Sequence, residues 1–185
     1  MIPPGATFGR LIEEWEEIRL DIDENCNPDI IAALPDLSDI ETSSYDAIFS
    51  SHNIEHLFPH EVDIALLEFN RVLKDDGYLL ITCPDLKSVA KHVAEDKLLD
   101  VLYESPAGPI SALDILYGHR LSLQKGNHYM AHKCGFTRTV LMGLFNNAGF
   151  KAVTGAERQN LFDLWCIGSK DENAEQKSIE QILRS

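Results

Sequence analysis

Residues 45–85 alternate between two hydrophobic periods, and the pattern predicts a strand, a helix and a second strand. Apolar residues at 47–49 are followed directly by two serines, as in a strand that is buried on both faces. Apolar residues then recur at helical spacing before a second apolar run at 78–82. Because a helix connects the two runs, we expect them to be parallel neighbours in an α/β sheet.

A turn is predicted between this helix and the second strand at residues 74–77, Lys-Asp-Asp-Gly. Gly77 is expected to adopt the left-handed conformation that ends many helices. The first strand ends in Ser50, Ser51 and His52, and the second also ends in polar residues. Ligands bind at the carboxyl ends of the strands in open parallel sheets, so we expect the functional site there.

The remaining pattern predicts one domain over residues 1–170, with an insertion at about 103–130 and a charged tail at 171–185. The insertion, rich in Pro, Gly and His, is expected to be a long loop with a short helix. Further elements are expected as helices at 7–17, 86–102 and 137–148, and as strands at 18–22, 151–154 and 161–168.

The middle of the chain resembles a class I S-adenosylmethionine-dependent methyltransferase of the type 11 kind. That family has an Asp opening its fourth strand, a Ser/His loop with Leu-Glu-His, and an Arg-Val-Leu-Lys-Pro-Gly-Gly turn. Here these are Asp46, residues 50–56 and residues 71–77, with Asp-Asp in place of Pro-Gly. The resemblance implies a doubly wound, mostly parallel Rossmann-like sheet, S-adenosylmethionine as cofactor and an unidentified small-molecule methyl acceptor.

The family's first strand and its GxGxG turn are not found in this sequence. Gly5 and Gly9 have the wrong spacing, and Pro3 and Pro4 argue against a central strand before them. Glycines in that turn let the backbone approach the cofactor closely, so we expect impaired cofactor binding. The missing first strand would leave a gap in the sheet, and three explanations remain open. The N-terminal segment fills the gap, a second subunit covers it in a homodimer, or the chain is a shortened family member.

The resemblance places cofactor contacts at the ends of the second, third and fourth strands. It implies that Asp21 binds the ribose hydroxyls, that Asp36 lies beside the adenine, and that Ser50 and Ser51 border the sulfonium. The family often has Asp where Ala33 stands, a second departure on the cofactor side. The alternative for both aspartates is an ordinary polar turn, a common place for Asp.

His52 is the candidate catalytic residue, because an imidazole titrates near neutral pH and can act as a general base. The segment also matches H-x-x-E-H, the inverted zinc-hydrolase pattern, through His52, Glu55 and His56. That chemistry needs both histidines on one helical face. His52 is expected in the loop before the helix, so no metal site is predicted and the hydrolase remains a remote alternative.

The insertion is expected to lie over the strand ends as a lid that binds the acceptor. Its candidate residues are Tyr117, His119, Arg120 and His128. Asn127 and His132 belong to the same polar cluster, for which metal binding and simple packing are the alternatives. Methyl transfer needs positioning and exclusion of water, which gives a lid a physical purpose.

Composition narrows the class of partner. The formal net charge of −14 disfavours nucleic acids and anionic membranes, which need clustered Lys and Arg. We expect no signal peptide, and the four cysteines lack CxxC spacing, so we expect a reduced, cytoplasmic protein. Two functions remain open: a methyltransferase, and a non-catalytic binding or scaffold protein that kept the fold.

Overall fold

A computed structural model describes residues 16–172 and contains a four-stranded sheet in the order β3-β4-β8-β7. The strands of this sheet are β3 (Tyr45–Ser51), β4 (Leu73–Pro84), β7 (Ala152–Arg158) and β8 (Asp163–Ser169). The helices beside it are α2 (Pro59–Val72), α3 (Leu86–Ala94) and α6 (Arg138–Asn147), and a short 3-10 helix η2 (Ile54–His56) follows β3.

The sheet is mixed, with three strands in one direction and one reversed. β3 and β4 pair in parallel, whereas β8 is antiparallel to both β4 and β7. The predicted strand-helix-strand unit is confirmed, as are the helix and the closing pair of strands that follow the insertion. The reversed strand comes from the tight connection between β7 and β8, because antiparallel neighbours need only a short turn.

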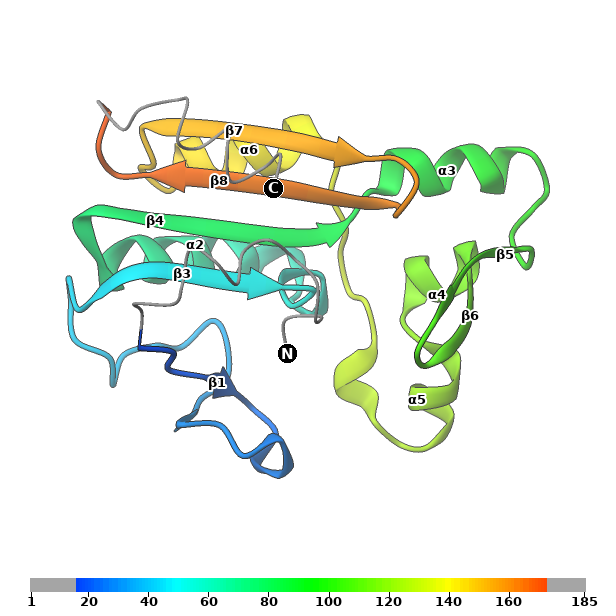
Figure 1. Ribbon diagram of the computed structural model, residues 1–185, viewed down its shortest axis with the longest axis horizontal. Coiled ribbons are helices and arrows are strands. Elements are labelled where there is room, and N and C mark those ends of the chain that lie inside the picture. Colours follow the sequence, from blue (N-terminus) through cyan, green and yellow to red (C-terminus); the bar gives the residue numbers. More distant parts are fainter. Residues whose placement is uncertain (1–15, 173–185) are drawn as a thin grey trace.

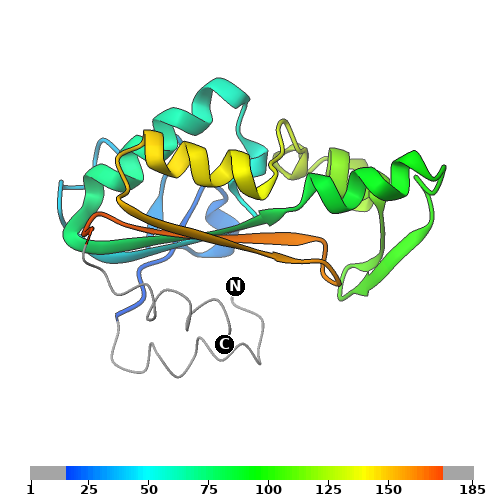
Figure 2. The same ribbon diagram turned by 90° about the horizontal axis from the view of Figure 1, so that it is seen from above.

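Both α2 and α6 cover the same face of the sheet, as Figure 2 shows. Their apolar sides and the sheet form the main core, which includes Leu66, Leu79, Phe145 and Leu164, all fully buried. A smaller cluster around Leu80 and Ile167 lies apart from that core. The strands are therefore apolar on both faces, as the uninterrupted hydrophobic runs predicted.

β1 (Leu20–Asp21) and β2 (Ile30–Ile31) form a separate parallel pair that has no ladder with β3. Within residues 16–172, no strand stands where the family's first strand would join the two sheets. Arg71 holds the connecting segment instead, because its Nη1 and Nη2 donate to the carbonyls of Ile40 and Leu37, each at 2.8 Å. This explains the arginine of the Arg-Val-Leu-Lys motif.

Two predicted boundaries are wrong. Gly77 does not adopt a left-handed conformation; α2 ends at Val72, and the chain enters β4 directly through an irregular stretch. The helix predicted at 86–102 ends at Ala94, because Asp96 takes a φ of 60° and closes the helix. The amides of Asp96 and Lys97 donate to Val93 and His92, which is the Schellman pattern without its usual glycine.

The insertion is more ordered than the predicted loop. It contains the hairpin β5 (Val101–Ser105) and β6 (Gly108–Ser111), the helices α4 (Ala112–Tyr117) and α5 (Arg120–Gln124), and the 3-10 helix η3 (His128–Met130). Figure 1 shows it beyond the carboxyl ends of β3 and β4, where a lid was expected. A side chain at Gly118 would collide with the carbonyl of Met130, so this glycine allows η3 to approach α4.

Asp114 anchors the insertion from a buried position. Its carboxylate accepts hydrogen bonds from Arg120 Nε at 2.7 Å and Nη2 at 3.0 Å, and from the amide and hydroxyl of Ser111. Burial opposes ionisation, but these bonds outweigh it and hold the pKa of Asp114 well below the usual carboxyl range. This network closes α4 and α5 onto the end of β6.

No helix within residues 16–172 is long and apolar enough to cross a bilayer. The helix predicted at 7–17 lies outside the described residues except for Glu16 and Glu17, which are not helical. All but the first two residues of the predicted tail at 171–185 also lie outside them.

We predict that Asp114→Asn lowers the free energy of unfolding at pH 7 by about 1–3 kcal/mol, because it removes a buried charged partner of Arg120. The pKa of Asp114 is depressed by folding, so this stability is present above the unfolded value near ~3.9 and is lost as pH falls further. Urea denaturation should therefore show a smaller difference in unfolding free energy between the wild type and Asp114→Asn near pH ~2.5 than at neutral pH.

The matched control is Asp46→Asn, which disrupts the exposed pair between Asp46 and Lys74. Such pairs contribute less than about 1 kcal/mol. Equal stabilities for the wild type and Asp114→Asn at pH 7 would contradict the anchoring role.

Candidate functional site

The candidate site lies where β3 and β4 end together. The His52 amide donates to the carbonyl of Thr82 at 2.8 Å, which extends the ladder by one bond beyond β3. His52 has a φ of 49°, a left-handed conformation that costs free energy in a residue with a Cβ. This turn reverses the chain from β3 into η2, so His52 lies in the loop, as predicted, and not on a helix shared with His56.

Glu55 occupies the first turn after His52, and its side chain is only 1% exposed. His52 Nδ1 lies 3.3 Å from Glu55 Oε1, within ion-pair distance, but neither carboxylate oxygen of Glu55 has a hydrogen-bond partner. A buried carboxylate without such bonds is costly, because it has lost its hydration. A positive charge close to the Glu55 carboxylate would therefore be stabilising.

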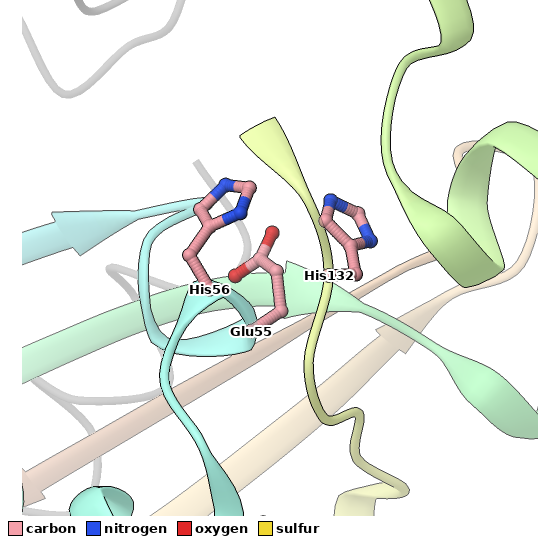
Figure 3. Close-up of side chains that lie close together, drawn as sticks. All are labelled: Glu55, His56 and His132. Atoms are coloured by element: carbon pink, nitrogen blue, oxygen red, sulfur yellow. The ribbon is translucent and has the colours of Figure 1, made fainter. Parts of the chain in front are cut away.

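Two imidazoles flank this carboxylate. Figure 3 shows the Glu55 carboxylate between the rings of His56, from η2, and His132, from the segment after the insertion. The two rings meet edge to face, with centroids 4.9 Å apart. His56 Nδ1 lies 3.1 Å from the carbonyl oxygen of Ala131, and His132 Nδ1 lies 2.7 Å from that of Ile115. Because a carbonyl oxygen only accepts, Nδ1 donates in each ring, and in a neutral imidazole Nε2 then keeps its lone pair.

Main-chain hydrogen bonds bring residues 131–134 to this place. The carbonyl of Glu55 accepts from the amides of Lys133 at 2.9 Å and Cys134 at 3.3 Å, and the amide of His132 donates to the carbonyl of Tyr117. We call residues 131–134 the return segment, because it carries the chain from the insertion back to α6. Its backbone joins η2 to α4 and holds His132 beside Glu55.

The protonation of the histidines follows from their surroundings. Desolvation lowers the pKa of His52, but the hydrogen-bonding capacity and charge of Glu55 outweigh it, so the pKa of His52 is raised. Burial lowers the pKa of His132, against the opposing charge of Glu55. Burial also raises the pKa of the Cys134 thiol to about 11, so this cysteine is a thiol and not a thiolate.

A cavity of about 270 Å³ opens beside these groups. His52, Glu55, His56 and His132 line its polar side, together with Asp114 and His119. The other residues that line it are Pro84, Tyr103, Ile110, Ile115, Met130, Leu161 and Phe162. A small concave space with a few converging polar groups and an apolar wall is typical of a site for a small molecule.

The predicted cofactor contacts lie outside the lining of this cavity. Asp21 ends β1, and its carboxylate accepts from the Asp23 amide. Asp36 is exposed, and its bond from Ser38 lowers its carboxyl pKa. Ser50 is buried with no hydrogen bond to its hydroxyl. Ser51 accepts from the hydroxyl of Thr82 at 3.1 Å. Their role toward a cofactor stays a prediction.

The predicted lid residues divide into two groups. His119 lines the cavity, with its Nδ1 2.9 Å from the Ser122 hydroxyl. Arg120 is bonded to Asp114 through two nitrogens. Tyr117 and His128 are exposed and do not line the cavity. The structure thus gives Arg120 an anchoring contact, and acceptor binding by the group stays a prediction.

Sequence analysis did not predict the joint cluster of Glu55, His56 and His132. The H-x-x-E-H pattern pointed to Glu55 and His56 but paired them with His52, and His132 was noted only as part of the insertion. The signal that remained in the sequence was the histidine in the polar stretch between the insertion and α6, and no spacing rule connects that histidine with residue 55.

Comparison with known proteins finds a family match over part of the chain. The family model described as a methyltransferase domain matches residues 17–81. No protein of curated function matches the sequence. A methyltransferase from Archaeoglobus fulgidus shares 16% identity over 87% of this chain and 80% of its own, with a TM-score of 0.53. A protein from Pyrococcus horikoshii shares 14% identity over 88% of this chain and 76% of its own, with a TM-score of 0.54.

A Thermotoga maritima protein described as a possible histamine N-methyltransferase shares 19% identity over 75% of this chain, with a TM-score of 0.44. This chain spans 60% of that protein's length and between 31% and 34% of three larger methyltransferase structures. The likenesses with a TM-score above 0.5 support the fold alone. The match over residues 17–81 of the 185 supports the resemblance to class I S-adenosylmethionine-dependent methyltransferases of the type 11 kind, and it supports S-adenosylmethionine as the cofactor.

Proposed function

We propose that this protein transfers a methyl group from S-adenosylmethionine to a small nucleophile held in the cavity beside His52. The observation that carries the proposal is the position of that cavity. It lies next to the carboxyl ends of β3 and β4, where ligands of open α/β sheets bind, and the family-matched segment leads directly into it. Its volume of about 270 Å³ suits a small molecule.

His52 is the proposed general base. It lines the cavity, and its contact with Glu55 orients the ring and favours the imidazolium that forms once a proton has been accepted. Bound S-adenosylmethionine would supply an electrophilic methyl group, and His52 would accept the proton that the acceptor loses when its lone pair takes up that group. The apolar wall formed by Tyr103 and Phe162 excludes water from this step.

The proposed affinity for the cofactor is low. The sequence contains no GxGxG turn and has Ala33 at a position where the family often has Asp. Each net hydrogen bond contributes on the order of 1 kcal/mol, and a tenfold change in affinity corresponds to about 1.4 kcal/mol. A non-catalytic binding protein is the alternative function. Titration with S-adenosylhomocysteine distinguishes the weakened methyltransferase from this alternative.

We predict that S-adenosylhomocysteine binds the 185-residue chain with a dissociation constant nearer the millimolar than the micromolar range, by calorimetric titration. Asp21→Ala should remove the residual binding, because its carboxylate is the proposed ribose anchor, whereas Asp23→Ala serves as the neighbouring control. A micromolar constant would refute the weakened site. No binding even at millimolar ligand would favour the non-catalytic alternative.

We also predict that Ser50→Ala leaves the unfolding free energy unchanged or raises it by up to about 1 kcal/mol. The Ser50 hydroxyl is buried without a partner, so its removal costs no hydrogen bond within the protein. Denaturant unfolding measures this. A weaker affinity for S-adenosylhomocysteine in a variant of unchanged stability would identify Ser50 as a cofactor contact, and a loss of more than about 1 kcal/mol would contradict the prediction.

Turnover is tested by supplying S-adenosylmethionine with a panel of small amines, thiols and phenols and measuring the S-adenosylhomocysteine formed. His52→Gln should slow the reaction by about 100-fold or more, as expected for loss of a general base. The control is His60→Gln, because His60 is exposed and does not line the cavity. An unchanged rate in His52→Gln would exclude the proposed base.

A further inference from the structure

Glu55, His56 and His132 offer one ligand atom each, and these atoms all lie within 4.8 Å of one another. An ion with bonds of about 2.1 Å and tetrahedral geometry holds its ligand atoms roughly 3.4 Å apart. The observed separations reach up to 4.8 Å, so the three side chains must move closer together to bind an ion.

The surroundings of each ligand agree with this role. The Glu55 side chain is 1% exposed and its two oxygens accept no hydrogen bond, so the 3.3 Å contact with His52 only partly replaces the hydration that the carboxylate has lost. His56 and His132 each direct Nδ1 at a main-chain carbonyl, which leaves Nε2 available with its lone pair. A histidine fixed in this way by a carbonyl is the usual arrangement of a metal ligand.

We propose that Glu55, His56 and His132 bind one divalent transition-metal ion of the Zn²⁺ class. Two imidazoles and one carboxylate suit such ions, whereas Mg²⁺ and Ca²⁺ prefer oxygen ligands. Cys134 is not part of the set, because its thiol donates toward the carbonyls of Ile54 and Glu55. This metal site is independent of whether the chain binds S-adenosylmethionine.

All three ligands line the cavity, so the remaining coordination positions open toward it. A site with three protein ligands and an open position binds a water or a substrate atom there. The ion would therefore hold an oxygen or nitrogen of the methyl acceptor and position it near His52; this last step rests on the proposed function.

The experiment titrates Zn²⁺ by calorimetry into the full chain after chelator treatment and dialysis. The wild type is expected to bind one equivalent and to melt at a higher temperature with the metal. Glu55→Gln, His56→Asn and His132→Asn should each weaken binding by more than about tenfold. Asparagine places an amide donor where Nδ1 stood, so both histidine variants keep the bond to Ala131 or Ile115 and lose only Nε2.

The matched controls are His60→Asn and His128→Asn, since both histidines are exposed and lie outside the cluster. They should bind Zn²⁺ as the wild type does. Equal affinity in the wild type and the three ligand variants would overturn the proposal, and so would the absence of a site in the wild type. Circular dichroism of the metal-free variants verifies that they are folded.

Co²⁺ provides a second measurement that needs no variant. Its visible absorption in the wild-type protein should show ligand-field bands without a thiolate charge-transfer band, because the ligands are nitrogen and oxygen. A thiolate band would place the metal on a cysteine and overturn the assignment. Metal binding without S-adenosylhomocysteine binding would refute only the proposed function, and the reverse result would refute only the metal site.

Discussion

The parallel pairing of β3 with β4 is the constraint on which the rest of the site depends. The register places Ser50 opposite Ile81 and Ser51 opposite Thr82, so both strands end at the same edge of the sheet. One strand then turns through His52 into η2, and the other leads through Asp85 into α3. Because parallel strands send both carboxyl ends the same way, every polar loop of this unit gathers on one side.

The return segment completes that edge. Just after it, Phe136 forms a bridge with Asp85, and its carbonyl accepts the amide of Leu86. Asp85 is buried and caps α3 by accepting from the amides of Lys87 and Ser88. The same edge is thus held by main-chain bonds from three distant parts of the chain. These bonds keep Glu55 in a buried position that is unfavourable for a carboxylate.

The predicted cofactor contacts and the residues of the cavity differ in how they are arranged. On the cofactor side, the sequence lacks the Gly-rich turn and has Ala33, and Asp21 and Asp36 accept bonds from their own loops. On the side of the cavity, Glu55, His56 and His132 lie close together, and a main-chain carbonyl contacts Nδ1 of each of the two histidines. The polar side chains of the cavity therefore lie closer together than the predicted cofactor contacts, which lie outside its lining.

The sequence by itself determined the strand-helix-strand unit, the final helix and the closing pair of strands, because long periodic runs of apolar residues have few alternatives. It also placed His52 in the loop before η2. It mispredicted Gly77 and the end of α3, where main-chain bonds close the turn through Asp96, a residue that carries little local signal. Only the tertiary structure decided that His132 joins Glu55 and His56. That contact depends on hydrogen bonds between η2, α4 and the return segment. A local sequence pattern does not predict which distant carbonyl accepts the hydrogen bond of a given amide.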